Sequence, residues 1–403
     1  MGRLVAAVAA GLGCCAMALA GTAPAMGAPA AFGVQDDRLN SPGELPADRL
    51  SLIEQSRTKV TRHDVLWSHI APERPRRPAD PGDRAYDFER LDAIVRGLAE
   101  RDIVPILVVY TTPAWAAARG GPPPDTGNTD AHAPDPSQFA AFMRALARRY
   151  DGTYRPRNST ERLPEVRHWE LWNEPNLGAF LSPQFTAGEP TGLRHYAAMV
   201  RRAYPVIKRT NRDAVVIAGV AGPRSSTTAT GTGSLAWVRA LARSSARFDA
   251  YSQHVYPSQP PRANTRANRL AFPTWRTLPR LFEELDAVPR RRGMPVYITE
   301  AGYTTAKTPF RSVRFTRRQQ ALYLRQIANL RVVRSGRIPA VIWFNLQDNP
   351  NWPSGLVGNA GGFRGAKKPS WPAFRRIAAG RALHPHLLPR GARGLPPVRF
   401  LPG

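Results

Sequence analysis

The chain has 403 residues, of which 42% are hydrophobic and 9% aromatic. This composition is sufficient for one large domain with a sizeable core, and it excludes a wholly disordered protein. Lysine and arginine outnumber aspartate and glutamate by 57 to 30, which gives a formal net charge of +27. Such a charge attracts anionic polymers. The arginines are nevertheless scattered over the chain and accompany abundant alanine, proline and glycine, which also fits a general compositional bias.

Residues 1–30 have the features of a secretory signal peptide. Arg3 precedes an apolar run from Leu4 to Ala20, and small residues offer cleavage points at Ala25 and Ala30. A membrane anchor is the alternative, but the high alanine and glycine content and the nearby Pro24 favour cleavage. We therefore expect a secreted, extracellular protein without a membrane span after signal cleavage.

Cysteines and cofactor motifs are missing from the rest of the sequence. The only two cysteines, Cys14 and Cys15, lie within the leader, so the exported chain has neither a disulfide nor a thiolate metal site. The sequence contains no glycine-rich phosphate loop, no His-x-x-Glu-His type zinc motif and no long internal repeat. We therefore expect a monomer that binds no metal and no organic cofactor.

Apolar, strand-like runs alternate with amphipathic, helix-like stretches after the leader. The predicted strands are Ala31–Val34, Val60–Trp67, Ile103–Tyr110, Val166–Trp172, Ala214–Val220, Phe248–Val255, Pro295–Thr299 and Ala340–Phe344. The predicted helices are Pro42–Gln55, Phe88–Glu100, Gln138–Tyr150, Leu193–Arg209, Ser234–Ala242, Leu278–Arg291, Arg317–Val333 and Trp371–Ala379. Eight such pairs predict an α/β protein with a single (β/α)8 TIM-barrel domain over residues 31–382. A basic, proline-rich tail follows over residues 383–403.

Several of the predicted connections from strand to helix are long and rich in proline and glycine. They are Ala71–Ala85, Thr111–Pro136, Pro257–Pro273 and Asp348–Pro369. In a TIM barrel these loops surround the site of chemistry. Their length predicts a built-up rim for an extended ligand.

Two of the predicted strands lead directly to a glutamate. Residues 168–176 read His-Trp-Glu-Leu-Trp-Asn-Glu-Pro-Asn, and alternation along this strand places Glu174 at its C-terminal end, before Pro175 stops the sheet ladder. Residues 296–303 read Val-Tyr-Ile-Thr-Glu-Ala-Gly-Tyr and place Glu300 at the end of the seventh strand. The two side chains can face each other across the barrel mouth. Cleavage of a glycosidic bond needs such a pair, one carboxyl that protonates the leaving oxygen and one carboxylate that attacks the anomeric carbon.

These segments resemble clan A of the glycoside hydrolases, and families 39 and 5 in particular. The clan carries Asn-Glu at the end of strand four, with the acid/base, and Glu at the end of strand seven, the nucleophile. Asn173-Glu174 and Thr299-Glu300 match this pattern, and the resemblance spans residues 32–379. It implies a retaining hydrolase of O-glycosyl compounds that acts by double displacement on an oligosaccharide or polysaccharide. Glu174 would be the acid/base and Glu300 the nucleophile.

The same resemblance implies roles for polar residues around the pair. Arg62 on strand two would lie beneath the nucleophile and keep it ionised, although a structural ion pair is the alternative. Asn173 would donate to the sugar 2-hydroxyl. His254 and Tyr256 end strand six, where the clan places residues that bond to the nucleophile, but each could instead be a packed core residue.

Two aromatic residues are candidates for sugar contacts. Trp343 on strand eight occupies the position of the clan's aromatic floor, and Trp115 follows strand three. Both could instead belong to the packing of the barrel. Weaker candidates for site residues are Tyr110, Asp37 and Asp348.

Two other functions compete with the enzyme. A catalytically silent barrel could bind an anionic cell-surface glycan through its charge, but such a protein has no need for both glutamates. A basic nucleic-acid-binding protein needs a basic patch interleaved with stacking aromatics, and the export signal and barrel pattern argue against it. We expect a polysaccharide partner, with an anionic one among the candidates, and no specific nucleic acid.

Overall fold

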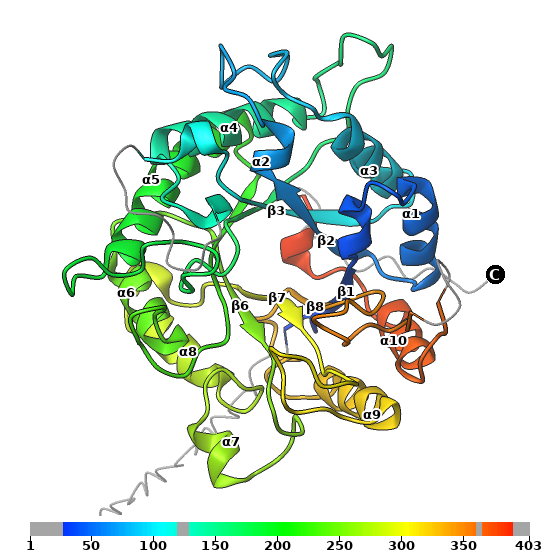
Figure 1. The fold of residues 1–403 in the computed structure, drawn as a ribbon. Helices are drawn as coiled ribbons and strands as arrows, with labels where there is room; N and C mark the ends of the chain where they lie inside the picture. Colours follow the sequence, from blue (N-terminus) through cyan, green and yellow to red (C-terminus); the bar gives the residue numbers. More distant parts are fainter. Residues whose placement is uncertain (1–26, 119–128, 360–364, 390–403) are drawn as a thin grey trace, which may run out of the picture.

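The computed structural model describes residues 27–118, 129–359 and 365–389. Eight parallel strands pair in chain order and close into a barrel (Figure 1), which confirms the predicted (β/α)8 fold. The barrel closes where Val34 of the first strand pairs with Trp343 of the last. The strands are β1 (Ala31–Gln35), β2 (Val60–Leu66), β3 (Val104–Tyr110), β4 (His168–Leu171), β5 (Val215–Ala221), β6 (Ala250–Val255), β7 (Val296–Ala301) and β8 (Ala340–Trp343).

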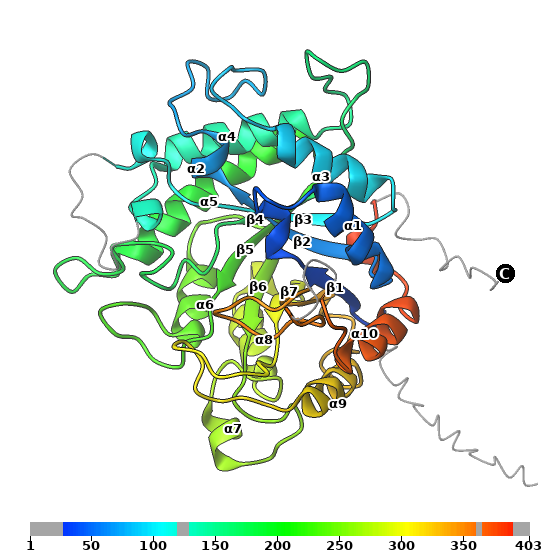
Figure 2. The ribbon, with the colours of Figure 1, turned by 45° about the vertical axis from the view of Figure 1, so that its right-hand side comes forward.

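Helices surround the barrel on the outside (Figures 1 and 2). They are α1 (Pro46–Gln55), α2 (Trp67–Ile70), α3 (Glu89–Ala99), α4 (Pro136–Arg149), α5 (Thr191–Thr210), α6 (Ser234–Arg243), α7 (Arg266–Leu270), α8 (Leu278–Asp286), α9 (Arg317–Ala328) and α10 (Ser370–Ala379). Short 3-10 helices are η1 (Asp37–Asn40), η2 (Ala114–Ala116), η3 (Thr129–Ala131), η4 (Pro289–Arg291) and η6 (Pro385–Leu387). No helix within the described ranges is both long and apolar enough to cross a membrane.

Some predicted boundaries differ from the structure. The first helix begins at Pro46 and not at Pro42, because Leu45 before it has an extended backbone and proline favours the first helical turn. The predicted loop Pro257–Pro273 contains the short helix α7. Residues 1–26 of the predicted signal peptide, residues 119–128 and 360–364 of two predicted loops, and residues 390–403 of the predicted tail lie outside the described residues.

Strand alternation divides the core into two apolar layers. Residues such as Val60, Ile106 and Ile217 form the layer inside the barrel, whereas their neighbours pack against the helices. Leu387 of η6 packs into the inner layer at the end of the barrel where the strands begin. The beginning of the segment that we predicted as a tail therefore closes the end of the barrel at which the strands start.

The inner layer becomes polar toward the carboxyl ends of the strands. Two residues after Val60, the inward position on β2 is Arg62, and the two inward positions after Ala250 on β6 are Ser252 and His254. All three of these polar side chains are buried. The apolar half of the barrel thus supports a polar half at the end where TIM-barrel sites lie.

Candidate active site

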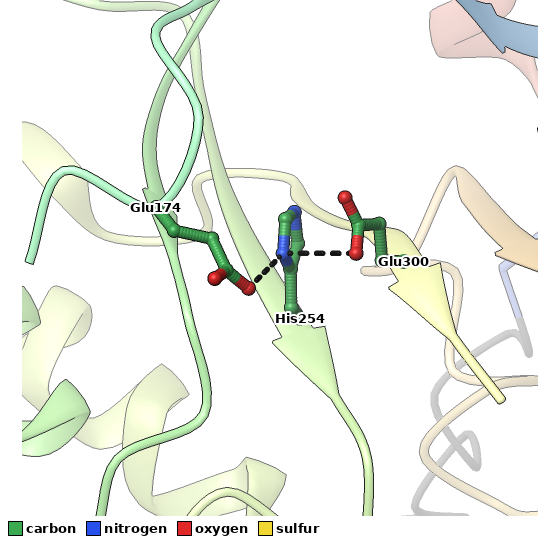
Figure 3. Close-up of side chains that lie close together, drawn as sticks. All are labelled: Glu174, His254 and Glu300. Atoms are coloured by element: carbon green, nitrogen blue, oxygen red, sulfur yellow. Dashed lines mark hydrogen bonds and ion pairs between the residues drawn. The ribbon is translucent and has the colours of Figure 1, made fainter. Parts of the chain in front are cut away.

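Glu174, His254 and Glu300 point toward one another in the barrel mouth (Figure 3). The imidazole Nδ1 of His254 lies 2.8 Å from Oε1 of Glu174 and 3.5 Å from Oε2 of Glu300. One oxygen of each carboxylate and one ring nitrogen of His254 all lie within 4.8 Å of one another. The structure therefore brings together the two glutamates that the sequence singles out, although 125 residues of chain separate them.

Glu174 is positioned by a turn and not by the strand itself. Strand β4 ends at Leu171, three residues earlier than the predicted alternation required. The backbone then adopts positive φ angles of 69° at Trp172 and 41° at Glu174, in a region that side chains other than glycine rarely occupy. Trp172 is buried, and its indole N–H donates to the carbonyl of Phe180 at 2.7 Å. Packing thus holds a strained backbone that directs the Glu174 side chain into the mouth.

Glycine at position 222 gives Glu174 the space it occupies. A Cβ atom at Gly222 would lie 2.7 Å from Cδ of Glu174 and 2.7 Å from Cδ1 of Leu177, closer than real contacts permit. The amide N–H of Gly222 donates to Oδ1 of Asn176 at 2.7 Å. The backbone of the loop after β5 therefore packs directly against the Glu174 side chain.

Glu300 faces the barrel because strand β7 contains an irregularity. Ser252 of β6 pairs with Tyr297, but His254, two residues further, pairs with Glu300, so three steps on β7 match two on β6. Such a bulge lets consecutive residues face the same side. Thr299 contacts Ser252 inside the barrel, and Glu300 beside it also faces inward.

Arg62 is the hub of the hydrogen bonds beneath the pair. Its Nη1 donates to Oε1 of Glu300 at 2.7 Å, and its Nη2 donates to Oδ1 of Asn173 at 2.7 Å. Its Nε donates to Oε2 of Glu170 at 2.6 Å, and Nη1 also donates to Oε1 of Gln35 at 2.7 Å. The Arg62 side chain is almost completely buried. Its position beside Glu300 matches the role expected from the sequence.

Glu170 is a site residue that the sequence analysis did not identify. Its side chain is inaccessible to solvent, and its Oε1 accepts a hydrogen bond of 2.6 Å from the hydroxyl of Thr299. Its other oxygen pairs with Arg62. Glu170 therefore connects the arginine to the residue next to Glu300. A carboxylate within the apolar run before Asn173 was the signal, because a buried charge needs partners.

The two glutamates have different surroundings. Glu300 accepts hydrogen bonds from Arg62 at Oε1 and from the hydroxyl of Tyr256 at Oε2, the latter at 2.7 Å. The carboxyl group of Glu174, by contrast, is hydrogen-bonded to the ring of His254. Tyr256 thus contacts the expected nucleophile as predicted from the resemblance, whereas His254 lies nearer to Glu174.

Burial dominates the ionisation of the site. It raises the pKa of Glu174 from 4.5 to about 7, against a smaller opposing effect of the Arg62 charge. Burial, together with the Glu174 charge, raises the pKa of Glu300 to about 7, while the Arg62 charge and the Tyr256 hydroxyl act to lower it. Burial lowers the pKa of His254, so its ring is neutral near pH 7. Arg62 and Tyr256 both donate to Glu300 and stabilise a charge on it, and Glu174 has neither contact, so the geometry favours Glu174 as the protonated member of the pair.

The two tryptophans lie in packed positions. Trp343 is fully buried on the face of β8 that packs against the helices, and its indole N–H donates to the carbonyl of Ser354 at 2.8 Å. Trp115 is half-buried, donates to the carbonyl of Ala71 at 2.8 Å and packs edge-on against Trp67. The structure therefore does not bring either ring to the carboxylate pair. Alternation explains the first case, because Ile342 takes the inward position.

A second acidic group lines the mouth next to Arg62. The Gln35 amide donates to Oδ1 of Asp37 at 3.1 Å and to Oδ2 of Asp64 at 3.2 Å, and the Tyr110 hydroxyl reaches Asp64 at 3.3 Å. Burial, followed by the Asp64 charge, raises the pKa of Asp37 to about 7. Asp37 and Tyr110, weak candidates from the sequence, thus belong to one acidic wall. Asp348, the other weak candidate, is ion-paired with Lys368 at 2.6 Å.

The cluster of Glu174, His254 and Glu300 has donor atoms of the kind that hold a metal ion. Both oxygens of Glu300 already accept hydrogen bonds, from Arg62 and from Tyr256. These contacts orient the Glu300 carboxylate without a metal ion. Glu174, His254 and Glu300 are therefore better suited to acid–base chemistry than to metal binding. Activity measured in the presence of a chelator tests this interpretation directly.

Comparisons with known proteins identify the fold. No protein-family model and no curated protein matches the chain. A family 39 glycoside hydrolase from Bacteroides cellulosilyticus WH2 has a TM-score of 0.59 at 21% identity, over 88% of this chain and 64% of that one. The family 39 enzyme from Xanthomonas axonopodis pv. citri and a monomeric β-xylosidase from Caulobacter crescentus CB15 each reach 0.60 at 16% identity over 89% of this chain, and 68% and 70% of theirs. This chain thus spans less than two thirds of the Bacteroides protein, and its barrel resembles those of solved family 39 glycoside hydrolases.

Proposed function

We propose that the protein is a retaining glycoside hydrolase with Glu174 as general acid/base and Glu300 as nucleophile. The observation that carries this proposal is the closeness of the two carboxylates, since one oxygen of each lies within 4.8 Å of the other and both groups contact the same nitrogen of His254, at 2.8 Å and 3.5 Å. Retaining enzymes hold the pair about 5–5.5 Å apart, whereas inverting enzymes leave about 6.5–9.5 Å for a water molecule. The likeness of the barrel to family 39 structures supports the same conclusion.

The first half of the reaction needs a protonated Glu174 and an ionised Glu300. Protonated Glu174 gives its proton to the glycosidic oxygen as the bond to the anomeric carbon breaks. Ionised Glu300 attacks that carbon and forms a glycosyl ester, and the leaving alcohol departs neutral. Arg62 and Tyr256 hold the Glu300 carboxylate and fix its orientation.

The second half reverses the role of Glu174. Once Glu300 is esterified its negative charge is gone, so the pKa of Glu174 falls and this group becomes a base. It takes a proton from water, the hydroxide attacks the anomeric carbon, and Glu300 leaves as a carboxylate. The sugar regains its original anomeric configuration after two inversions.

The mouth favours a neutral sugar next to Glu300. Asp37 and Asp64 lie on the wall beside Arg62, and their carboxyl groups can exchange hydrogen bonds with sugar hydroxyls but provide no positive charge for an anionic sugar. The similar Caulobacter protein is a β-xylosidase. We therefore propose oligosaccharides or polysaccharides of neutral β-linked sugars as the first substrates to test.

Export remains part of the proposal. The apolar leader with its small-residue cleavage points supports secretion, although most of it lies outside the described residues. Expression of the full chain, followed by N-terminal sequencing of protein from the culture medium, tests this point. Mature protein that begins at Met26 or Ala31 is expected, whereas uncleaved protein retained with the cell membrane would contradict export.

Hydrolysis of a panel of aryl glycosides and polysaccharides tests the enzyme itself. The wild type is compared with Glu174→Gln and Glu300→Gln, and Glu284→Gln on the outer surface is the matched control. We expect turnover to fall by about a thousandfold or more in both site variants and to persist in the control and in excess chelator. Equal polysaccharide binding by all proteins without any turnover would instead identify a silent binding barrel.

A further inference from the structure

A basic groove runs along α5 on the outer wall of the barrel. A cavity of about 590 Å³ is bordered by five cationic side chains, Arg201, Lys208, Arg209, Arg212 and Arg247. A neighbouring cavity of about 420 Å³ shares Arg201 and Arg209 with it and adds Arg144 and Arg202. We call these residues together the α5 groove. The sequence spreads arginine over the whole chain, but folding concentrates seven cations here.

The cations of the α5 groove follow the helix period. Arg201, Lys208 and Arg209 are spaced by seven and one residues, which places them on one side of α5, and Arg212 follows just beyond the end of the helix at Thr210. Arg247 joins them from the segment before β6. An amphipathic helix turns its charged residues to solvent, but no acidic residue is among those that border the two cavities, and this one-sided charge needs its own explanation.

Most of these cations lack an acidic partner. Lys208 is ion-paired with Asp249 at 3.2 Å. Within the described ranges, none of the six arginines of the α5 groove forms an ion pair, whereas Arg239 on neighbouring α6 pairs with Glu284. Clustered like charges repel one another, and a bound anion relieves that repulsion. The six arginines of the groove are therefore available to bind an anion from outside the described chain.

The aromatic residue of the first cavity is already occupied. Arg247 lies 5.3 Å and Lys208 5.9 Å from the ring centre of Tyr204. The Tyr204 hydroxyl donates to Oδ1 of Asp249 at 3.0 Å. Single-stranded nucleic acids bind by stacking bases on free aromatic rings, and this ring is held by its neighbours. Recognition in the α5 groove therefore depends on charge and on guanidinium hydrogen bonds.

The α5 groove is remote from the candidate active site. Arg201, Lys208 and Arg209 lie on the C-terminal half of α5, which leads into the start of β5 at Val215, and Arg247 precedes the start of β6. Glu174 and Glu300 lie at the opposite, carboxyl ends of the strands, and α5 runs along the outside of the barrel (Figure 1). A polymer held in the groove would leave the mouth open.

We propose that the α5 groove binds a linear anionic glycan and anchors the protein to it. Planar guanidinium groups form paired hydrogen bonds with carboxylate or sulfate oxygens, and a linear polymer with repeated anionic groups can contact several of these arginines at once. This binding is independent of catalysis. The anchoring polymer is anionic, whereas the acidic wall of the mouth suits a neutral substrate.

The test measures affinity for polygalacturonate and for heparin, which separate carboxylate from sulfate recognition. The groove variant carries Arg201, Arg209, Arg212 and Arg247 all changed to Gln. The control variant carries the same change at Arg314, Arg318, Arg325 and Arg331, on and beside α9, so both lose four charges from a total of +27. Thermal melting and aryl-glycoside hydrolysis confirm that both variants are folded.

We expect the groove variant to lose affinity for at least one of the two polymers by about tenfold or more at moderate salt, and the control by about twofold or less. Glu300→Gln should bind like the wild type. Equal losses in the two arginine variants would overturn the proposal, because the attraction would then be general. Tighter binding of single-stranded DNA than of either glycan, with the same dependence on the groove, would also overturn it.

Discussion

Arg62 connects Glu300 to Glu170, with hydrogen bonds of 2.7 Å to the first carboxylate and 2.6 Å to the second. The guanidinium therefore divides its charge between a proposed catalytic group and a fully buried structural carboxylate. Glu170 also accepts a hydrogen bond from Thr299, the residue before Glu300. Arg62 is thus held beneath the proposed nucleophile by Glu170, a carboxylate that is itself inaccessible to solvent.

Glu170→Gln should change the pH dependence of the enzyme. The substitution keeps the side-chain shape but removes a negative charge, so the Arg62 charge acts more strongly on Glu300 and lowers its pKa. The acidic limb of kcat/KM should then move to lower pH. Stability should fall by about 3–5 kcal/mol, since one partner of a buried ion pair is lost. Activity across pH and urea unfolding measure the two effects.

Thr299→Val is the control for Glu170→Gln. It removes the hydroxyl bond to Glu170 but leaves every charge in place. It should lower stability without moving the acidic limb. An unmoved limb in Glu170→Gln as well would show that Glu170 is structural only.

Tyr256→Phe should move the acidic limb in the opposite direction. The Tyr256 hydroxyl donates to Oε2 of Glu300 and lowers its pKa. Without this bond the pKa of Glu300 rises, and the ionised nucleophile forms only at higher pH. A hydrogen bond to a charged group contributes about 1.5–3 kcal/mol, so the limb should shift upward by about one to two pH units.

Tyr303→Phe is the matched control for that shift, because the buried Tyr303 hydroxyl donates to the carbonyl of Gln259 and not to either glutamate. Its pH profile should be unchanged. If both tyrosine variants shift the profile equally, the effect does not come from the bond to Glu300.

Gly222→Ala should reduce turnover by displacing the acid. The added methyl group would lie 2.7 Å from Cδ of Glu174, so the carboxyl group must move. Misplacement by about 1 Å can reduce the rate about a hundredfold. Gly43→Ala, where no atom lies within 4 Å of the new methyl group, should retain full activity. Normal kcat in Gly222→Ala would show that the position of Glu174 is not critical.

Glu174→Gln should stabilise the protein at high pH. Burial raises the pKa of Glu174 from 4.5 to about 7 in the folded state, so its favourable contribution exists below pH 4.5 and is lost as the pH rises through 7. The neutral amide avoids this loss. The gain should reach at most about 3 kcal/mol near pH 8 and vanish near pH 4.

Urea unfolding at both pH values measures this gain. Glu284→Gln should behave in the opposite way, because the bond from Arg239 lowers the pKa of Glu284. The stability that this surface glutamate contributes is present above pH 4.5 and lost as the pH falls. A wild type that is more stable than Glu174→Gln near pH 8 would contradict the assignment of a buried, destabilising charge.

The barrel could be predicted from sequence because buried parallel strands are almost purely apolar and alternate regularly with helices. The two glutamates stood out at the ends of such runs. Their exact placement could not be derived, since alternation counted from the inward Tyr297 would turn Glu300 outward. The bulge in β7 and the turn at Trp172 correct this, and both depend on contacts with distant strands.

Residues that act through burial were harder to find. Glu170 looked like one polar residue in a strand, and its role appears only when Arg62 and Thr299 are placed beside it. Trp343 was predicted as a site residue but lies in the packing between β8 and the helices. Successive residues of a strand face opposite sides, so a shift of one residue decides whether an aromatic ring faces the barrel mouth or the helices. The arginines of the α5 groove likewise form a group only after folding.

The covalent intermediate tests the central claim most directly. The wild type is incubated with 2-deoxy-2-fluoro xylosides and glucosides that carry good leaving groups, which slow hydrolysis of the glycosyl ester, and the protein is then digested and analysed by mass spectrometry. Our account predicts a single glycosyl adduct on the peptide that contains Glu300, and none in Glu300→Gln. Turnover of the parent glycosides with inversion of configuration, or an adduct on Glu174, would contradict it.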